Sequence, residues 1–459
     1  MIVRVFLFIL LLCVGVNTLE SLCSNNVSDK KCLCKRLTNQ ATNLPTSLAN
    51  CNGLSINEFP KLYQFPDDLT VLDLSMNNIQ FLNFSSNNDI LQKLILSFNS
   101  INVIEEHFFQ SLPELAWLDL SHNNISSFDN VNIFLEQKRL VYLDLSYNNF
   151  KELPSAVFEP IPLLRVLDLS YNPLGKFLTN SKDVLNMQLG LSTNITHFKL
   201  NNVGLSDLHP DYFGQYQGLK HLEFQDNNLQ FIPTVPYSVE YLDFSGNNLT
   251  FISARYLNYH SLKILRLSRM PTLVSIHHYA FYNLPSLESL IITDCPNIKE
   301  FTDLAFGLAS KTMEIHPKRL ILARNGLAKL NSTYKHMFRR MEHIDLRHNP
   351  WDCNCALLWM QEFNAELFKG NEIRCAGPPQ LKRKRLQDLT HFDLPDCFPD
   401  IYGKTSHRVT IIILMATVIF LMGLIFYLIR YPKAWVNPRH IGIGPNSPYS
   451  AAPQDDVRF

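Results

Sequence analysis

The sequence predicts an α/β solenoid with a parallel sheet on its concave face and loops and short helical turns on its convex face, plus one transmembrane helix. Three observations predict this fold. A spacing of leucines, one asparagine and one isoleucine recurs along most of the chain, first at Leu69, Leu72, Leu74, Asn77 and Ile79. Cysteines gather in fours at both ends of the repeating region. A long apolar run follows near the C-terminus.

Residues 1–18 are predicted to be a secretory signal peptide. Arg4 supplies a positive charge, and residues 5–16 form an apolar core before the short residues around Thr18. This order is typical of a cleaved export signal. A membrane anchor is the alternative interpretation, but the run is shorter than the roughly 20 residues that a span needs.

Residues 19–68 are predicted to form a cysteine-rich N-terminal cap. Cys23, Cys32, Cys34 and Cys51 make an even-numbered group in a chain that carries an export signal. Such groups become disulfides in exported proteins, because the compartment is oxidising. The cap would cover the leucines that the first repeat otherwise exposes to water.

Residues 69–348 are predicted to contain twelve repeats, each a short strand and a return loop. Alternation along the first strand places Leu72 and Leu74 on one face and Asp73 on the other. The leucines of one copy cannot be buried alone, so neighbouring copies must stack into a curved parallel sheet. Most copies lie 20 to 25 residues apart, the last strand falls within 341–351, and the copies start at Leu69, Leu91, Leu115, Leu140, Leu164, Ile195, Leu219, Val239, Leu262, Leu287, Pro317 and Met341.

The repeated asparagine predicts a ladder of hydrogen bonds along the turns that follow the strands. An amide side chain has two donors and an acceptor, enough to join its own turn to the neighbouring one. Cys295 takes this place in one copy and is predicted to be a buried free thiol, whereas Val203 and Met270 should interrupt the ladder. The ladder positions are Asn77, Asn99, Asn123, Asn148, Asn172, Asn227, Asn247, Asn325 and Asn349.

The return loops carry phenylalanines and two insertions. Phe108, Phe158, Phe213 and Phe281 are predicted to fill the core behind the sheet. The copies that span 164–195 and 287–317 are longer than the others. Insertions in solenoids lie on one face and often contact the ligand. A solvated or convex helix is an equally good interpretation of each.

Residues 349–397 are predicted to form a C-terminal cap. The segment NPWDCNCALLWMQEF contains Cys353 and Cys355, and Cys375 and Cys397 complete the second group of four. The spacing alone also fits a zinc site, but an exported chain favours disulfides.

A stalk at 398–408 is predicted to lead to a transmembrane helix at 409–429, which has no polar face. A cleaved lipid-anchor signal does not fit, because the polar-rich tail 430–459 follows the run. Signal and span together predict a single-pass type I protein of the plasma membrane with its N-terminus outside the cell. Val457 and Phe459 at the C-terminus fit a strand that adds to a PDZ domain.

The repeats and caps resemble the extracellular leucine-rich-repeat superfamily with repeats of about 24 residues. Members include Toll-like receptor ectodomains, trophoblast glycoprotein and neuronal adhesion proteins, and the resemblance covers Cys23 to Cys397. It implies a leucine-rich-repeat solenoid with the cap disulfides Cys23–Cys34, Cys32–Cys51, Cys353–Cys375 and Cys355–Cys397. The tail is too short for the signalling domain of Toll-like receptors, so direct Toll-type signalling is not expected.

Six Asn-x-Ser/Thr sequons predict N-glycosylation of the ectodomain. All six precede the predicted transmembrane helix, as glycosylation requires. They are Asn26, Asn83, Asn124, Asn194, Asn248 and Asn331.

The outward positions of the N-terminal repeats are rich in aromatic residues. Exposed aromatic clusters suit protein interfaces, because they bury a large area with few rotatable bonds. The predicted ligand-binding residues here are Phe98, Trp117, Tyr142, Tyr147 and Tyr171, with His122 beside them. The stripe of Asp73, Asp119, Asp144 and Asp168 belongs to the motif LDLS and is interpreted as a property of the repeat rather than of a ligand site.

The outward positions of the C-terminal repeats carry arginines instead. Arg266, Arg269, Arg319, Arg324 and Arg347, with His343 and His348, are predicted to bind an acidic protein face or a sulfated glycan. The alternative is a solvated face that is partly paired with Asp294 and Asp345. The run Lys-Arg-Lys-Arg at 382–385 is a solvated loop, a membrane or glycan contact, or a protease site.

The sequence favours binding over catalysis. It contains no phosphate-binding loop, no HExxH and no GxSxG motif, and we expect no enzymatic activity, cofactor or metal. The formal net charge of zero gives no reason to expect a nucleic-acid partner. The predicted function is a receptor, co-receptor or adhesion protein that binds an extracellular protein or a neighbouring membrane receptor. The alternatives are an accessory subunit of a membrane channel or receptor complex, or a shed ligand trap.

Overall fold

The computed structural model of the chain describes residues 22–24, 31–38, 45–83, 87–128, 130–307, 315, 317–363, 366–368 and 372–431. It consists of two compact units, Met1–Leu389 and Thr390–Phe459. The predicted signal peptide, the sequon at Asn26, and Val457 and Phe459 lie outside the described residues.

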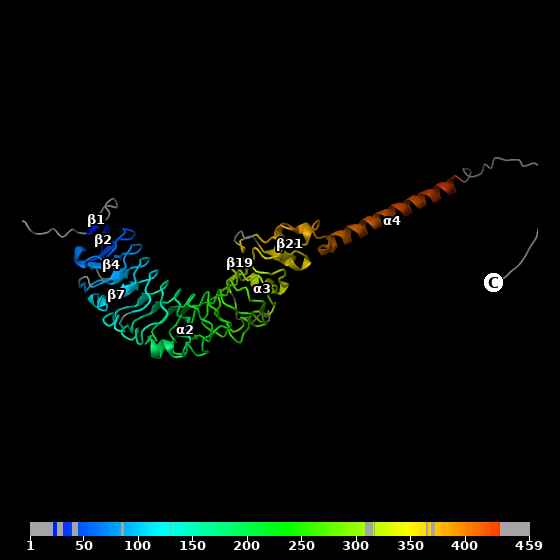
Figure 1. Cartoon of the computed structure of the whole chain (residues 1–459). Helices are drawn as coiled ribbons and strands as arrows, with labels where there is room; N and C mark the ends of the chain where they lie inside the picture. Colours follow the sequence, from blue (N-terminus) through cyan, green and yellow to red (C-terminus); the bar gives the residue numbers. More distant parts are fainter. Residues whose placement is uncertain are drawn as a thin grey trace, which may run out of the picture. The chain divides into compact units, whose positions relative to one another are not determined.

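A 15-stranded sheet lines the inner face of the first unit (Figure 1). Twelve of its strands are the predicted repeat strands, and they pair in parallel in the order of the sequence. These strands are β4 (Leu69–Asp73), β6 (Lys93–Ile95), β8 (Trp117–Asp119), β9 (Tyr142–Asp144), β10 (Val166–Asp168), β11 (His197–Lys199), β12 (His221–Glu223), β13 (Tyr241–Asp243), β15 (Ile264–Arg266), β17 (Ser289–Ile291), β18 (Arg319–Ile321) and β19 (His343–Asp345). The predicted solenoid of parallel strands is confirmed.

The register of the sheet aligns equivalent positions of successive repeats. Leu72 pairs with Leu94, which pairs with Leu118, and the same leucine position continues along the sheet. These leucines have no exposed surface. Burying each one contributes roughly 1.5–3 kcal/mol, so the repeated leucine is the main reason that the turns stack.

The asparagine ladder joins neighbouring turns, as predicted. Asn148 donates from Nδ2 to the carbonyls of Leu145 at 3.1 Å and Leu120 at 2.9 Å, and its Oδ1 accepts from the amide of Ile125 at 3.0 Å. One side chain therefore fixes its own turn and the turn before it. At Cys295 the thiol replaces the amide and lies 3.6 Å from the carbonyl of Leu267.

The predicted gaps in the asparagine ladder and the predicted buried thiol of Cys295 are both present. Val203 and Met270 are buried apolar side chains that take no part in the ladder. Cys295 is free and fully buried, and burial raises the pKa of its thiol to about 11. The thiol is therefore protonated and unreactive at neutral pH.

The return loops close the core on the side opposite the large sheet. Phe108, Phe158, Phe213 and Phe281 are buried there, as predicted. The first insertion forms α2 (Gly175–Leu178) and η3 (Val184–Gln188), and α2 lies on the outer side of the curve (Figure 1). This placement favours the convex-helix interpretation of the insertion. The other short elements of the loops are η1 (Leu62–Gln64), β5 (Phe81–Leu82), β7 (Val103–Ile104), η2 (Phe109–Ser111), β14 (Phe251–Ile252), β16 (Ser275–Ile276), η4 (Ser332–Tyr334) and α3 (Lys335–Phe338).

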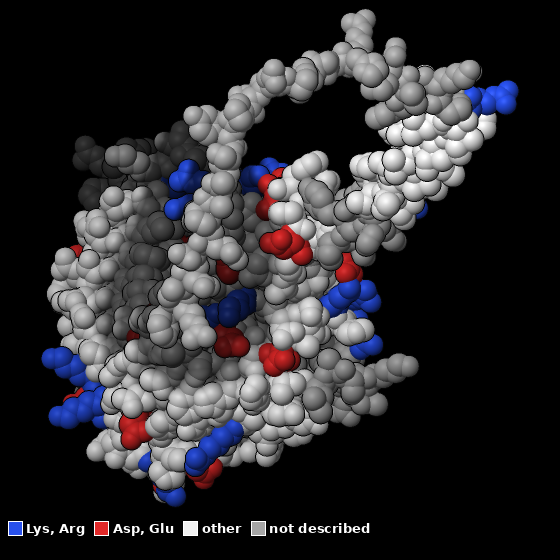
Figure 2. Space-filling model, turned by 90° about the vertical axis from the view of Figure 1, so that its right-hand side faces the viewer, with Lys and Arg blue, Asp and Glu red and all other residues white. Residues whose placement is uncertain are grey.

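Charged side chains of both signs are interspersed on the surface seen in Figure 2, with no broad region of one sign. Many form ion pairs between turns. Glu240, for example, lies 2.6 Å from Lys263 and 3.4 Å from Lys220. Solvent screens such exposed pairs, so each contributes little to stability and these pairs do not decide the fold.

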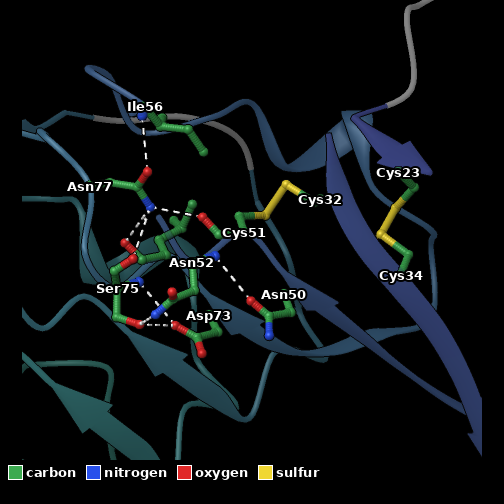
Figure 3. Close-up of a disulfide and its surroundings, with 11 residues drawn as sticks. Cys23, Cys32, Cys34, Asn50, Cys51, Asn52, Ile56, Asp73, Ser75 and Asn77 are labelled. Carbon is green, nitrogen blue, oxygen red and sulfur yellow. Dashed lines mark hydrogen bonds between the residues drawn. A yellow bond between two sulfur atoms is a disulfide. The ribbon is translucent and has the colours of Figure 1, made fainter. Parts of the chain in front are cut away.

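The N-terminal cap extends the sheet by three strands, which the repeat pattern does not predict. They are β1 (Cys23–Ser24), β2 (Cys32–Thr38) and β3 (Pro45–Asn50), and β2 and β3 are antiparallel. Disulfides join the implied pairs Cys23–Cys34 and Cys32–Cys51 (Figure 3). Asn77 donates to the carbonyl of Cys51 at 2.9 Å, so the ladder begins at the cap itself.

The C-terminal cap of the first unit covers the other end of the stack. The indole of Trp351 is fully buried and donates to the carbonyl of Leu346 at 2.9 Å. The disulfide Cys353–Cys375 is present, as the resemblance implies. Cys355 and Cys397 are also disulfide-bonded. The elements of this region are β20 (Trp351–Asp352), η5 (Cys355–Glu362), β21 (Cys375–Gly377), η6 (Pro379–Leu381) and η7 (Leu386–Asp388).

The second unit contains η8 (Pro395–Cys397) and the long helix α4 (Pro399–Arg430). The segment Arg408–Arg430 of α4 is long and apolar enough to cross a membrane, and the described part of the chain has one such helix. The helix begins at Pro399, within the predicted stalk 398–408.

Candidate ligand-binding face

Two rows of side chains project from the N-terminal half of the sheet. The inner row follows the middle of the strands and includes Lys93, Trp117 and Tyr142, which are paired in register. The edge row occupies the position just before each ladder asparagine. It consists of Phe98, His122, Tyr147 and Tyr171.

The inner row is a continuous stack. The rings of Trp117 and Tyr142 lie 3.5 Å apart and are nearly parallel, at 6°. The ammonium of Lys93 lies 4.3 Å from the centre of the Trp117 ring, on the neighbouring strand. Parallel strands in register place equivalent side chains one above the other, and this alignment produces the stack.

The edge row stacks in the same way along the turns. Its ring centres are 3.9 Å apart for Phe98 and His122, 3.9 Å for His122 and Tyr147, and 4.0 Å for Tyr147 and Tyr171. All four residues have φ between 52° and 57°, an uncommon conformation for side chains of this size. The turn before each ladder asparagine imposes this conformation, and it points the rings along one edge of the sheet.

The stacking determines which part of each ring a ligand meets. The faces of the rings contact the neighbouring rings of the stack, so the ring edges and polar tips point outward. Trp117, Phe98 and Tyr147 remain 38%, 48% and 41% exposed. A shallow groove runs between the edge row and the ladder asparagines Asn99, Asn123 and Asn148. The predicted aromatic cluster is therefore two ordered stacks rather than one patch.

The aspartate stripe lies beside the inner row and has a structural role. Asp119, Asp144 and Asp168 each accept a hydrogen bond from the amide of the serine two residues on, at 2.9 Å. The repeat itself requires this contact, which agrees with the structural interpretation of the stripe. Burial raises the pKa of Asp144 to about 6, and burial also raises the pKa of Asp168.

A polar network occupies the middle of the sheet, and the sequence analysis did not predict it. Glu223 accepts from Asn201 at 2.7 Å and lies 2.7 Å from Nε2 of His221. Lys199 lies 3.6 Å from Asp168 and 3.9 Å from Glu223, so it links the aspartate stripe to this network. The repeat phase could have placed these residues, because His197 and His221 continue the inner row after Tyr142 and Val166.

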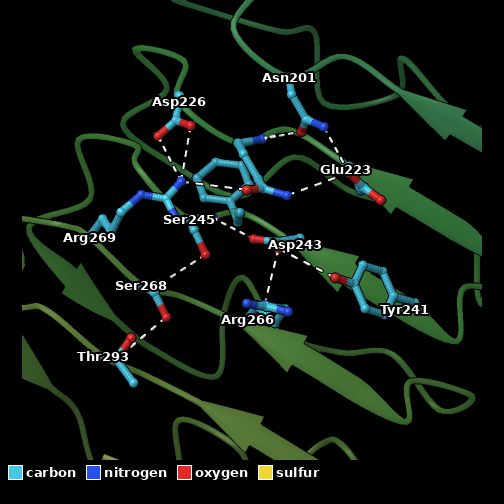
Figure 4. A network of polar contacts seen from close by, with 12 residues as sticks. Asn201, Glu223, Asp226, Tyr241, Asp243, Ser245, Arg266, Ser268, Arg269 and Thr293 are labelled. Carbon is cyan, nitrogen blue, oxygen red and sulfur yellow. Dashed lines mark hydrogen bonds and ion pairs between the residues drawn. The ribbon is translucent and has the colours of Figure 1, made fainter. Parts of the chain in front are cut away.

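The predicted arginine patch is largely an ion-pair network, and Figure 4 shows the pairs made by Arg266 and Arg269. Arg266 lies 3.2 Å from Asp243, Arg269 lies 2.9 Å from Asp226, and Arg324 lies 2.6 Å from Asp294. Arg347 lies 2.7 Å from Asp345. Two of these four acids, Asp294 and Asp345, are those of the alternative interpretation. Arg319 is exposed and has no acid partner among the described residues.

The Arg269–Asp226 pair spans an intervening repeat. The equivalent position in that repeat is Gly246, whose φ is +73°. A Cβ there would lie 2.0 Å from Oδ1 of Asp226, so only glycine leaves room for the two charged groups to meet.

The asparagines of five of the six sequons lie in the described part of the chain. Asn83, Asn124, Asn194 and Asn331 are exposed, and Asn248 is half-buried. Asn331 also caps η4, where its Oδ1 accepts from the amide of Thr333 at 3.0 Å. Their glycosylation stays a prediction.

The fold, the ladder and the disulfide-linked caps define the class: the chain is a solenoid of leucine-rich repeats, and it fits the extracellular leucine-rich-repeat ectodomains. The leucine rich repeat family matches residues 89–134 and 130–174. The chain is 27% identical to osteomodulin of Rattus norvegicus over 44% of this chain and 50% of that protein. It is 26% identical to the CD180 antigen of Mus musculus over 61% of this chain and 39% of that protein. It thus spans half or less of the length of these relatives.

The solved structures agree with this fold. The TLR13–ssRNA13 complex contains a chain that superposes with a TM-score of 0.51, over 70% of this chain and 47% of that one, at 23% identity. At this identity, the likeness supports the shape of the solenoid and not the ligand.

Proposed function

We propose that this chain is a single-pass type I receptor, co-receptor or adhesion protein of the plasma membrane that binds a protein through the N-terminal half of its concave sheet. The observation that carries the proposal is the pair of ordered aromatic stacks on an open face. Side chains that are already ordered lose little entropy on binding, so their contacts contribute more of their energy to affinity.

The chemistry of this half indicates the kind of partner. The aromatic edges and tips lie beside the half-buried Asp119 and Asp144, so the face is apolar and acidic together. A protein surface that presents lysine or arginine next to apolar side chains complements it. The acidic stripe disfavours the phosphates of a nucleic acid, because like charges approach each other there.

A panel of purified, multimerised cell-surface ectodomains, applied to cells that display the full chain, tests the proposal. Trp117→Ala with Tyr142→Ala should lower the affinity for a bound ectodomain at least tenfold, the effect of losing a central aromatic pair. The matched control is Tyr237→Ala with Tyr282→Ala, which removes two exposed aromatic rings that lie in return loops.

Surface expression of both double variants is measured in parallel with an antibody to an appended tag. Equal loss of binding in the control pair, or unchanged binding in the Trp117 and Tyr142 pair, would contradict the use of the inner row.

A further inference from the structure

The C-terminal cap contains a basic cavity that the concave-face proposal does not use. The cavity has a volume of about 480 Å³. It is lined by Arg347 and His348 of the last turn, by Glu372 and Arg374 beside β21, and by Lys382 and Arg383 of the following loop. Its volume lies within the range of small-ligand sites, roughly 300–1,000 Å³.

The loop that carries the basic run is held in place, unlike a free solvated loop. The amide of Arg383 donates to the carbonyl of Cys375 at 2.8 Å, and the amide of Cys375 donates to the carbonyl of Lys384 at 2.9 Å. The guanidinium of Arg374 donates to the carbonyl of Arg383 at 2.9 Å. The disulfide at Cys375 fixes the strand on which this loop rests.

Positive charge exceeds negative charge around the cavity. Glu372 is the single carboxylate in its lining, and it is shared by the guanidinium groups of Arg374 and Arg385. Arg347 is paired with Asp345. The side chains of Lys382 and Arg383 are exposed and have no acid partner among the described residues. Two cations are therefore available to an anion without breaking an existing pair.

The basic groups continue from the cavity along the edge of the sheet. Arg324 and His348 occupy equivalent positions, just before the ladder asparagine, in the last two repeats. Adjacent strands lie about 4.8 Å apart, so His348 lies at nearly that spacing from Arg324, whose guanidinium is paired with Asp294. A linear ligand with repeated charges suits such a row better than a single small ion does.

We propose that this cavity binds a sulfate group of a sulfated glycan chain, with Lys382 and Arg383 as the principal contacts. Guanidinium and ammonium groups form strong charge-assisted hydrogen bonds with such oxyanions. The disulfides of the cap indicate an oxidising compartment, where a protein meets polyanions as sulfated glycans. The proposal is independent of the protein ligand of the concave face.

Binding of a labelled heparin dodecasaccharide to the full chain in neutral-lipid nanodiscs, measured by fluorescence anisotropy over a range of salt, tests this site. Lys382→Gln with Arg383→Gln should weaken binding about tenfold and reduce the slope of log K against log salt by about 2. The matched control, Lys138→Gln with Lys151→Gln, removes the same charge from exposed lysines that have no acid partner in the described structure, and should change affinity less than twofold.

Two further probes distinguish recognition of sulfate groups from nonspecific electrostatic attraction of any anion to the basic side chains. A chemically desulfated dodecasaccharide should bind at least tenfold more weakly, and vesicles of phosphatidylcholine with phosphatidylserine should not compete. Equal binding by the two double variants, equal binding of the desulfated chain, or competition by the anionic vesicles overturns the proposal. Lys382→Gln alone repeats the test if the double variant does not reach the wild-type melting temperature.

Discussion

The two halves of the concave face use their outward side chains differently. In the N-terminal half, from Asn77 to Asn172, every turn has its ladder asparagine, and the outward aromatic residues contact each other but remain exposed. In the C-terminal half, the ladder continues at Asn227, Asn247, Asn325 and Asn349 but is interrupted at Val203 and Met270, and arginine–aspartate pairs also connect the turns. In the N-terminal half, the outward aromatic side chains are not held in ion pairs with neighbouring turns, so they are available for a ligand.

The two kinds of contact, ladder hydrogen bonds and surface ion pairs, also differ in energy. A ladder asparagine satisfies buried carbonyls, and a buried carbonyl without a donor costs about 1–3 kcal/mol. An exposed ion pair contributes about 0–1 kcal/mol. Both halves are therefore held by strong buried contacts of the ladder, and the C-terminal half adds several weak surface contacts. Three predictions test this comparison.

The largest effect is expected for the ladder. Asn148→Ala removes the donor for the carbonyls of Leu145 and Leu120 and the acceptor for the amide of Ile125, and should lower the free energy of unfolding by about 3 kcal/mol. The midpoint of urea unfolding, followed by far-ultraviolet circular dichroism, measures it. Asn149→Ala, in the next and exposed position, is the control. Similar unfolding midpoints for the two variants would contradict the prediction that the ladder is the main stabilising contact of this half.

A smaller and pH-dependent effect is expected for the aspartate stripe. Burial raises the pKa of Asp144 to about 6, above its ordinary value of 3.8. The fold therefore binds a proton there more tightly than the unfolded chain does, and the contribution of Asp144 to wild-type stability falls as the pH rises from about 4 to about 6. Asp144→Asn keeps an oxygen that accepts from the amide of Ser146, and it removes the loss of stability that ionisation of the carboxyl group causes.

Asp144→Asn should therefore be more stable than wild type by about 1 kcal/mol at pH 7.4, with the difference vanishing near pH 4. Urea midpoints at pH 7.4, 5.5 and 4 measure it. Asp119→Asn, which removes a stripe carboxylate with the same contact to a serine amide, is the control. A constant difference across these pH values for Asp144→Asn would contradict the raised pKa.

The smallest effect is expected for the ion pairs of the C-terminal half. Arg269→Gln breaks the contact with Asp226 and should lower the free energy of unfolding by no more than about 1 kcal/mol, because both side chains are partly exposed. Arg319→Gln removes an arginine without an acid partner and serves as the control. Thermal melting at low and high salt compares them, and a loss for Arg269→Gln as large as for Asn148→Ala would mean that the two halves are held in the same way.

Periodicity made much of this architecture predictable from the sequence. The positions of all twelve repeat strands, the buried phenylalanines, the free Cys295 and the ladder with its gaps follow from spacing, because each depends on contacts between adjacent copies. The three strands of the N-terminal cap could not be predicted in this way, because Cys23–Ser24 and the other cap strands lie outside the repeat.

The candidate sites were predicted only as residue types. The spacing placed Trp117 and Tyr147 on the outward side, but it did not separate the inner row from the edge row. That separation depends on the positive φ of the turn before each asparagine, which a list of aromatic positions does not reveal. The polar network around Glu223 was not predicted, although its residues occupy the same repeat positions.

The sequence by itself determined that leucine strands stack, that both ends are closed by disulfide-linked caps and that one apolar segment can cross a membrane. These features are local or periodic, and burial of the leucine side chains drives the stacking of the strands. The tertiary structure decided which charged groups meet: Arg269 reaches Asp226 past Gly246, and Lys382 lies beside the same cavity as Arg347. Such pairings depend on register and side-chain reach between distant segments, which periodicity does not specify.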